Sequence, residues 1–433
     1  MCVKGEIVRN RVGEKLAARP PGPFVGSVGS GGTATDSERF ARSDVTWAAY
    51  LLLGYFGYLQ AVLGPLMPFL RRDLHLSYSA GGLHFSAFAA GMIVAGLSGN
   101  RITERLGRPA VFWGGAAGMA LGACGLLVGR QVALTIAGAG VMGLLGTLLL
   151  VTIQAALSDE HGTRRTQALT ESNIMASLCS GLSALFVGLA QGAGLGWRAA
   201  LAPPLLLLAL VAARFWRVSL PLAAPAAPRG RPGADGRLPG LFWIYWAVVV
   251  LSVAAEWCVA FWGTDYLQHV VGLDASVAAT AMGLYLFVTV VARVGGSRLA
   301  RTAPSAPLLV MAIGVALAGF LLFWLAPRGP LTIAGLFITA LGVANLFPLG
   351  LATALGIAPA LSSVTSARVS LGAGLAIFVA PLTLGGVADR VGIRLAYGAV
   401  PLLLCGAGAA ALGALALGRR RRAVDSRPLT AVN

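Results

Sequence analysis

The stretch VALTIAGAGVMGLLGTLLLVTIQAA, residues 132–156, contains 25 residues and no charged side chain. An α-helix rises about 1.5 Å per residue, so a run of this length crosses the roughly 30 Å hydrocarbon core of a bilayer. Because no water reaches that core, the backbone must satisfy its polar groups within one helix. The stretch therefore predicts a transmembrane helix.

Eleven further runs have the same character, each about 18 to 25 residues long, the length that a spanning helix needs. Short polar or Gly/Pro-containing segments separate them. The twelve predicted spans are residues 45–70, 78–98, 110–129, 132–156, 167–190, 198–216, 240–266, 274–294, 306–326, 331–355, 364–384 and 395–418. They predict an all-α polytopic membrane protein.

The composition of the 433-residue chain excludes a water-soluble protein. Hydrophobic residues make up 57% and charged residues 11% of the chain, and the mean hydropathy is +0.79, whereas soluble domains carry about a quarter charged residues. The formal net charge is +17, but the basic residues gather at the ends of the predicted spans. We therefore expect contacts with anionic lipid headgroups and no nucleic-acid partner.

The distribution of basic residues predicts the orientation. If the N-terminus is cytoplasmic, most of the 33 Lys and Arg residues fall in cytoplasmic segments, as the positive-inside rule requires. Both termini are then cytoplasmic, in a multi-pass protein of the cytoplasmic (inner) membrane. The expected segments are a disordered cytoplasmic tail at 1–44, six-helix bundles at 45–216 and 240–418, a cytoplasmic linker loop at 217–239 and a basic cytoplasmic tail at 419–433.

The two predicted bundles are related by an internal repeat at a shift of about 196 residues. The matching segments are Trp47 with Trp243, Gln60 with Glu256, Leu145-Gly146 with Leu341-Gly342, Gly196-Trp197-Arg198 with Gly392-Ile393-Arg394 and, at a shift of 197, residues 99–103 with 296–300. Two parallel six-helix repeats are an architecture of membrane transporters.

A motif between the second and third spans supports this interpretation. Glu104-Arg105-Leu106-Gly107-Arg108 is similar to the D-R-x-G-R signature of the major facilitator superfamily, and related motifs stand at 196–198, 295–301 and 389–392. Glu104 replaces the usual Asp, Asn100 stands where the signature begins with Gly, and Pro109 follows where a second basic residue is common. Over about residues 45–418 the chain resembles this superfamily. The resemblance implies twelve transmembrane helices in two pseudo-symmetric six-helix bundles.

The resemblance also bears on the branch of the superfamily. The fourth span lacks the Arg, and the fifth span the Gly-Pro pair, that mark the drug/proton antiporters, so drug efflux is not supported. Residues 256–266, with Trp262 and Leu267, are similar to the sugar/proton symporter branch. A sugar/proton symporter-like uptake carrier is therefore an alternative.

Glu256 is the only acidic residue that we place deep in the predicted spans. A carboxylate there costs about 3 kcal/mol on insertion scales, so we expect it to face a cavity and to hold a partner or a proton. With about 100° between successive residues of a helix, Tyr245 and Ser252 share its face. Its repeat mate Gln60 is expected at the same depth, so the two flank one central site. The alternative is a structural carboxyl bonded to a neighbouring helix.

Other polar residues are expected near this site. His84 reaches about the depth of Glu256 and can pair with it or relay a proton; the alternative is a packed histidine bonded to a backbone carbonyl. Pro348 cannot donate to the carbonyl four residues earlier, which leaves a free acceptor beside the amide of Asn345 and would line the cavity with polar groups; the alternative is a plain kinked helix. Gln154 is a further lining candidate.

A second group of residues is expected at a cytoplasmic gate. Gly107 permits a tight turn, and the arginines of the signature loop can reach phosphates or helix C-termini. Glu171 and Arg368 lie about one turn inside the fifth and eleventh spans, and either belong to the gate or reach to the interface. The whole group is Arg101, Glu104, Arg105, Gly107, Arg108, Glu171, Arg298, Arg301 and Arg368. A solvated loop without a latch role is the alternative for the signature loop.

The loop at 389–394 looks like a second copy of the signature. If the second span ends in the cytoplasm, however, the eleventh span ends on the outer side, so this loop lies on the outer side together with Arg198. No anionic inner leaflet retains basic residues on that side. We therefore expect Asp389 or helix-end carbonyls to hold Arg390 and Arg394.

Together these observations predict a secondary active transporter that moves a small organic solute across the membrane by alternating access, coupled to protons. We expect a monomer without a cofactor or a metal site. A membrane enzyme would need clustered His, Asp or Ser groups, which the predicted spans do not show. A transporter-fold sensor or channel is a further alternative, although a channel should show a pore-lining ring or filter.

Overall fold

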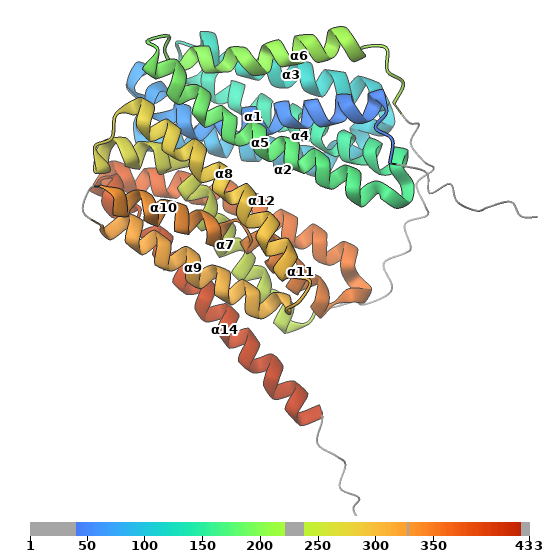
Figure 1. Cartoon of the computed structure of the whole chain (residues 1–433), viewed down its shortest axis with the longest axis vertical. Helices are drawn as coiled ribbons and strands as arrows, with labels where there is room; N and C mark the ends of the chain where they lie inside the picture. Colours follow the sequence, from blue (N-terminus) through green and yellow to red (C-terminus); the bar gives the residue numbers. More distant parts are fainter. Residues whose placement is uncertain (1–39, 221–237, 327–328, 426–433) are drawn as a thin grey trace, which may run out of the picture. The chain divides into compact units, whose positions relative to one another are not determined.

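The computed structural model describes residues 40–220, 238–326 and 329–425 (Figure 1). The described residues from Arg42 onward form one compact unit, and all of the helices belong to it. The predicted N-terminal tail up to residue 39, residues 221–237 of the predicted linker and residues 426–433 of the predicted C-terminal tail lie outside the described residues.

Six helices build the first half of the unit. They are α1 (Asp44–Asp73), α2 (Tyr78–Leu106), α3 (Arg108–Val128), α4 (Val132–His161), α5 (Arg165–Gly192) and α6 (Ala202–Phe215), with short 3₁₀ turns at Gly162–Arg164 and Trp197–Leu201. The predicted spans of this half match these helices to within a few residues, except at the C-termini of α2 and α4, which extend farther.

The second half repeats this order. Its helices are α7 (Gly240–Tyr266), α8 (Ala275–Leu299), α9 (Ser305–Leu325), α10 (Pro330–Val343), α11 (Leu346–Ile357), α12 (Ser362–Val391), α13 (Ile393–Ala396) and α14 (Ala399–Asp425), with a π-helical turn at Leu267–Val271 and a 3₁₀ turn at Pro359–Leu361. Each crossing of the second half begins 196 to 198 residues after its counterpart in the first half. The repeat that the sequence predicted is therefore present in the fold.

Twelve membrane crossings account for these helices. By length and composition, the described residues contain 11 stretches able to cross a membrane. One of them, Val132–Gly192, has 61 residues, more than twice what a bilayer needs, and consists of α4 and α5 joined by a turn. α10 and α11 together form the single crossing Pro330–Ile357. The prediction of an all-α fold with twelve transmembrane helices in two six-helix bundles is confirmed.

Local sequence explains where several helices begin. Ser43 and Ser77 cap α1 and α2, because their hydroxyl oxygens accept hydrogen bonds from backbone N–H groups three residues later, at 3.2 and 3.1 Å. Gly196 and Gly392 occupy equivalent positions of the repeat and both have positive φ, 78° and 80°, a backbone conformation that glycine adopts without strain. The same sharp turn therefore leads into the last crossing of each half.

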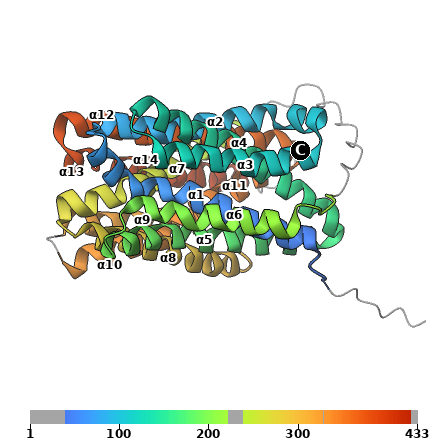
Figure 2. The ribbon, with the colours of Figure 1, turned by 90° about the horizontal axis from the view of Figure 1, so that it is seen from above.

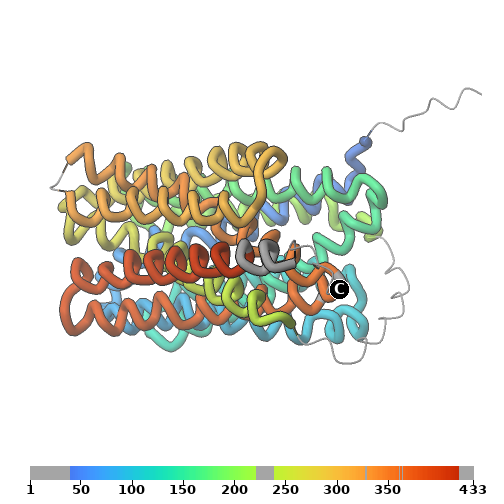
Figure 3. Tube along the Cα trace, turned by 90° about the horizontal axis from the view of Figure 1, so that it is seen from below, coloured from blue at the N-terminus to red at the C-terminus, as the bar shows by residue number. Residues whose placement is uncertain are grey.

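The two halves meet along three pairs of helices, one helix of each pair from each half. α2 packs against α12, α5 packs against α8, and α1 packs against α7 (Figures 1 and 2). Because α2 corresponds to α8 and α5 corresponds to α12, the first two pairs are equivalent by pseudo-symmetry. α14 runs back toward the end of the bundle at which α1 starts (Figure 3), as an even number of crossings requires. The ion pair between Arg71 and Asp265 and the contact of Asp389 with the start of α2 join the halves at the end where α1 ends and α2 begins. For these contacts we call it the closed end, and we call the opposite end, where α1 begins, the open end.

Candidate functional site

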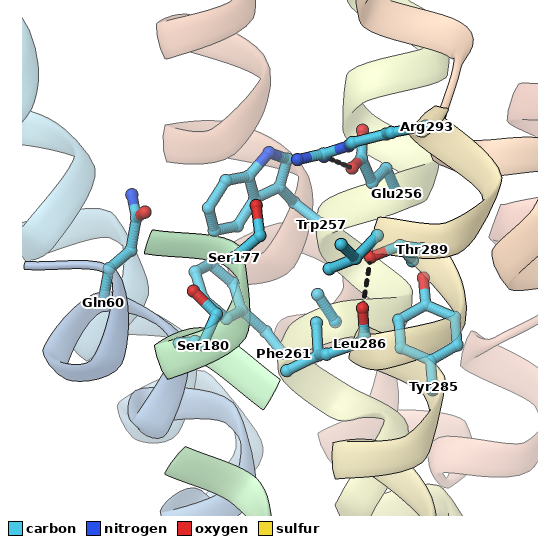
Figure 4. A pocket seen from close by; sticks show the side chains of 13 residues that line it. Gln60, Ser177, Ser180, Glu256, Trp257, Phe261, Tyr285, Leu286, Thr289 and Arg293 are labelled. Atoms are coloured by element: carbon cyan, nitrogen blue, oxygen red, sulfur yellow. Dashed lines mark hydrogen bonds and ion pairs between the residues drawn. The ribbon is translucent and has the colours of Figure 1, made fainter. Parts of the chain in front are cut away.

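A cavity of about 150 Å³ lies between the two halves (Figure 4). Four helices line it: α1 and α5 of the first half, and α7 and α8 of the second. The lining residues are Gln60, Ala61, Ser177, Ser180, Glu256, Trp257, Ala260, Phe261, Tyr285, Leu286, Thr289, Val290 and Arg293. The structure thus brings Gln60 and Glu256, which are mates in the repeat, to one cavity.

Glu256 and Arg293 form the charged part of the cavity. Nη2 of Arg293 lies 3.5 Å from Oε1 of Glu256, and the two side chains are 49% and 17% exposed. Glu256 lies in the middle of α7, and Arg293 lies in the last two turns of α8. Since an unpaired charge at membrane depth is costly, each side chain supplies the partner that the other needs.

The break between α10 and α11 holds Arg293 in place. Pro348 has no N–H, so the carbonyl of Ala344 is left without its helical donor. Nε of Arg293 donates to this carbonyl at 3.2 Å. The adjacent Asn345 amide donates to the carbonyl of Ala292 at 3.1 Å, which ties the same break to α8. The free acceptor that the sequence predicted therefore exists, and it positions a guanidinium.

Arg293 did not enter the sequence-based site. It stands near the end of a predicted span, where an arginine ordinarily reaches to the membrane interface. The signal that pointed to it was indirect: a proline-freed carbonyl in one helix needs a donor from another. Sequence alone does not say which helix lies alongside.

The remaining lining combines aromatic rings with uncharged polar groups. Trp257 and Phe261, one turn apart on α7, have ring centroids 4.9 Å apart and form an apolar wall. The Ser180 hydroxyl donates within the first half, to carbonyl oxygens of α1 and α5 at 3.0 and 2.8 Å. Nε2 of Gln60 lies 3.8 Å from the sulfur of Met92, a weak acceptor, so its amide retains hydrogen-bonding capacity. In Figure 4, Gln60 lies on the opposite side of the view from Arg293.

Of the two interpretations of His84, the structure shows the packed histidine and no contact with Glu256. His84 is fully buried, its Nδ1 lies 2.8 Å from the carbonyl oxygen of Ala80, and its Nε2 lies 2.9 Å from the hydroxyl of Thr135 on α4. Both ring nitrogens are therefore used within the first half, which is the alternative interpretation of this histidine.

Four other predicted lining residues stand elsewhere. Tyr245 and Ser252 are buried on α7, at positions other than those that line the cavity. Gln154 is exposed on α4. Asn345 bonds to α8, as described above. Sharing a helical face with Glu256 was therefore not enough to identify lining residues, because neighbouring helices cover most of that face of α7.

The closed end is held by polar contacts between the halves. Nη1 of Arg71 lies 2.6 Å from Oδ1 of Asp265, which is fully buried, and the Arg71 guanidinium stacks 3.4 Å above the ring centre of Tyr78. Asp389 of α12 accepts hydrogen bonds from the backbone N–H groups of Tyr78 and Ser79, at 2.6 and 2.8 Å, and from the Ser79 hydroxyl. A carboxylate at a helix N-terminus is favourable because the unpaired N–H groups and the helix dipole point at it.

Two expectations are corrected at this end. Asp389, which we expected to hold Arg390 or Arg394, binds the start of α2 instead, and both arginines are exposed. Asp265 is a second acidic residue buried within a span, so Glu256 is not the only one. Arg198 lies at the closed end, where it pairs with Asp73 at 2.7 Å.

The open end carries the predicted gate residues. Glu171 accepts two hydrogen bonds from Arg42, at 2.8 and 2.9 Å, and Arg108 of the signature loop pairs with Asp159 at 2.6 Å. Both pairs lie within the first half, and Gly107 makes the predicted turn with φ 79°. The exposed residues of the group are Arg101, Glu104, Arg105, Arg298, Arg301 and Arg368.

Two pseudo-symmetric six-helix bundles around a central polar cavity define the class of membrane carriers built from parallel repeats. The sequence profile of the Major Facilitator Superfamily matches residues 47–366, and the chain belongs to this superfamily. A search among curated proteins finds no match.

Solved structures with the same fold are transporters of diverse solutes. A bacterial homolog of the human lysosomal transporter Spinster, in an inward-facing conformation, is 16% identical with a TM-score of 0.67, over 86% of this chain and 96% of that chain. A D-xylose-proton symporter is 16% identical with a TM-score of 0.65, over 86% and 96%. A proton-dependent oligopeptide transporter is 15% identical with a TM-score of 0.70, over 87% and 99%. At these identities the likeness shows the fold.

Proposed function

We propose that the protein is a proton-coupled secondary transporter that moves a small organic solute across the cytoplasmic membrane by alternating access. The observation that carries the proposal is the Glu256–Arg293 pair, in a cavity whose lining comes from both halves. A solute bound at such a boundary is released to either side when one half moves against the other.

Glu256 is the coupling residue in this proposal. Its carboxylate holds the Arg293 guanidinium by charge, and a proton on Glu256 removes that charge and releases the donors of Arg293. Protonation and solute binding are therefore linked at one pair. The D-xylose-proton symporter and the proton-dependent oligopeptide transporter share the fold, which favours a proton over another coupling ion.

The proposed orientation follows from the basic residues. Arg101, Arg105 and Arg298 are exposed at the open end, and the positive-inside rule assigns that end to the cytoplasm. The closed end, with its Arg71–Asp265 pair, then faces outward. In this proposal the structure is the inward-facing state of a monomer. The proposed segments are the bundles at 45–216 and 240–418 and the cytoplasmic linker at 217–239.

The proposed inner gate extends the contact between α5 and α8. A Cβ added to Gly188, near the closed end, would meet Thr280, and one added to Gly181, beside the cavity, would meet Phe287. If α5 and α8 stay antiparallel in this register, Glu171 pairs with Ser297, the residue before Arg298. When the open end closes, Glu171 then meets Arg298, and a cysteine pair at these two positions should cross-link only in the outward-facing state.

Purified protein in liposomes with a pH-sensitive dye in the lumen tests the proposal. A panel of labelled sugars, nucleosides, peptides and organic acids should contain a solute that exchanges against its unlabelled form, which a channel or a sensor does not support. Glu256→Gln should abolish accumulation driven by a pH gradient and retain exchange, whereas Glu160→Gln, at an exposed residue of α4, should match the wild type. The proposal fails if no solute exchanges, or if Glu256→Gln accumulates solute like the wild type.

A further inference from the structure

The charges of the cavity specify a class of solute, and this inference rests on the proposed function. Among the 13 lining residues, Glu256 and Arg293 are the two that ionise readily. With both ionised, the pair is neutral. With a proton on Glu256, the cavity holds one positive charge. The bound proton therefore creates a site for one negative charge.

The geometry of Arg293 suits a carboxylate. Its Nε is occupied by the carbonyl of Ala344, which fixes the plane of the guanidinium and leaves the Nη groups toward the cavity. The 3.5 Å between Nη2 and Glu256 exceeds the roughly 2.7–2.9 Å of a charge-assisted hydrogen bond, and the side chain is 49% exposed. The Glu256 contact is thus loose enough for a second carboxylate to replace it, and paired Nη groups bind carboxylates in a fork.

The rest of the cavity sets the size and polarity of the solute. Its volume of about 150 Å³ matches that of engineered cavities that hold benzene. Trp257 and Phe261 supply a flat apolar wall, and Gln60 and Ser177 of the first half supply uncharged polar groups. These features fit a body about the size of one aromatic ring.

Among the groups around Glu256, only its own protonation changes the charge of the cavity. On α8 they are Arg293 and the buried hydroxyl of Tyr285. From α1 and α5 they are Gln60, Ser177 and Ser180, which do not titrate. α11, α12 and α14 also pack against α7, but in the described chain they contribute no residue to the lining. The charge on Glu256 therefore decides whether Arg293 is available.

We infer that the transported solute is a small monoanionic carboxylate with an apolar body, carried together with one proton. Glu256 takes up the proton and becomes neutral, and the ionised carboxylate of the solute replaces it on the Nη groups of Arg293. After the halves move, the solute leaves, and Glu256 returns its proton to the same side and pairs with Arg293 again. One positive and one negative charge cross together, so no net charge moves.

Binding of four ring-sized probes to the full-length protein in lipid nanodiscs tests the inference. Benzoate, phthalate, benzamide and benzylammonium have similar bodies and charges of −1, −2, 0 and +1. Calorimetry between pH 6 and 8 should show benzoate binding best, with an affinity that rises as the pH falls because the proton on Glu256 frees Arg293. Equal binding of benzamide, or preference for benzylammonium or phthalate, overturns the inference.

Substitutions in the pair separate its two roles. Arg293→Gln should weaken benzoate binding at least about 10-fold, the loss of one charge-assisted hydrogen bond. Glu256→Gln mimics the protonated carboxyl, so benzoate should bind tightly at every pH in the range. Arg130→Gln, at an exposed arginine outside the cavity, is the matched control and should bind like the wild type. A pH-dependent affinity in Glu256→Gln contradicts the exchange of carboxylates.

Transport of labelled mandelate, a monoanionic carboxylate with one aromatic ring, measured against protein-free liposomes, tests the charge balance. A pH gradient, acidic outside, should drive accumulation, and a potassium-diffusion potential set with valinomycin should leave the rate unchanged. If the potential drives uptake, or if another class of solute moves while carboxylates do not, the inference fails and the proposed transporter function stands. If no solute of any class moves, the proposed function itself fails.

Discussion

Asp265→Asn should shift the protein away from the state in which the closed end is sealed. Asp265 is fully buried and Arg71 is 13% exposed, with 2.6 Å between Nη1 and Oδ1. Removing one partner of a buried pair leaves an uncompensated charge, which costs about 3–5 kcal/mol. Stacking of Arg71 on Tyr78 and the hydrogen bonds that Asn can still accept reduce this loss, so we take the lower value. At about 3 kcal/mol, the ratio of protein with the closed end sealed to protein with that end open falls roughly 150-fold.

Distance measurements between spin labels at the closed end, one on each half, check this prediction. The wild type should show short distances, and Asp265→Asn should show a large population of long ones. The double variant Arg71→Met, Asp265→Leu removes both charges of this pair and leaves only the half-exposed His269 without its carboxylate partner. It should return toward the short distances, because no buried guanidinium is then left unpaired. If Asp265→Asn keeps the wild-type distances and unfolds at the wild-type temperature, the pair does not seal this end.

Three further predictions follow from single positions. Gly385→Ala places a methyl 2.6 Å from a carbonyl oxygen at the start of α2, so it should open the closed end in the same distance assay. The control Gly386→Ala places its methyl 3.7 Å from the nearest atom and should leave the distances unchanged. Equal effects of the two variants would refute the steric argument. Pro348→Ala supplies an N–H that competes with the guanidinium for the freed carbonyl, so pH-driven uptake should fall several-fold in a protein of unchanged thermal stability, and unchanged uptake would contradict this. An impermeant thiol reagent added outside intact cells should label a cysteine at Asp274 and spare one at Ser219, and the reverse result would invert the topology.

The spans and the repeat were predictable because a bilayer imposes simple rules. A helix long enough to cross must be apolar over about 20 residues, and this constraint acts on each stretch separately. The two halves have matching turns at Gly196 and Gly392, so the repeat could be recognised from the sequence without any knowledge of packing. The crossing formed by α10 and α11 was also foreseen, together with the free carbonyl beside Asn345.

The candidate site was predictable only in part. A buried carboxylate inside a span signals a cavity or a partner, and this argument led to Glu256 and, through the repeat, to Gln60. It could not supply the partner, because depth estimates put His84 level with Glu256 although its ring nitrogens point toward α4 and its own helix. Arg293 reaches Glu256 only because α8 packs beside α7 and the α10–α11 break fixes its guanidinium.

The membrane location of this protein, the number of its crossings and the equivalence of its halves could be read from the sequence, because they follow from local polarity, length and internal similarity. Which charged side chains meet depends on how the helices pack. Arg71 pairs with Asp265, and Asp389 binds the start of α2, across the boundary between the halves. Ion pairs and hydrogen bonds require contact within a few ångströms, and helices far apart in the chain reach that distance only by the way they pack.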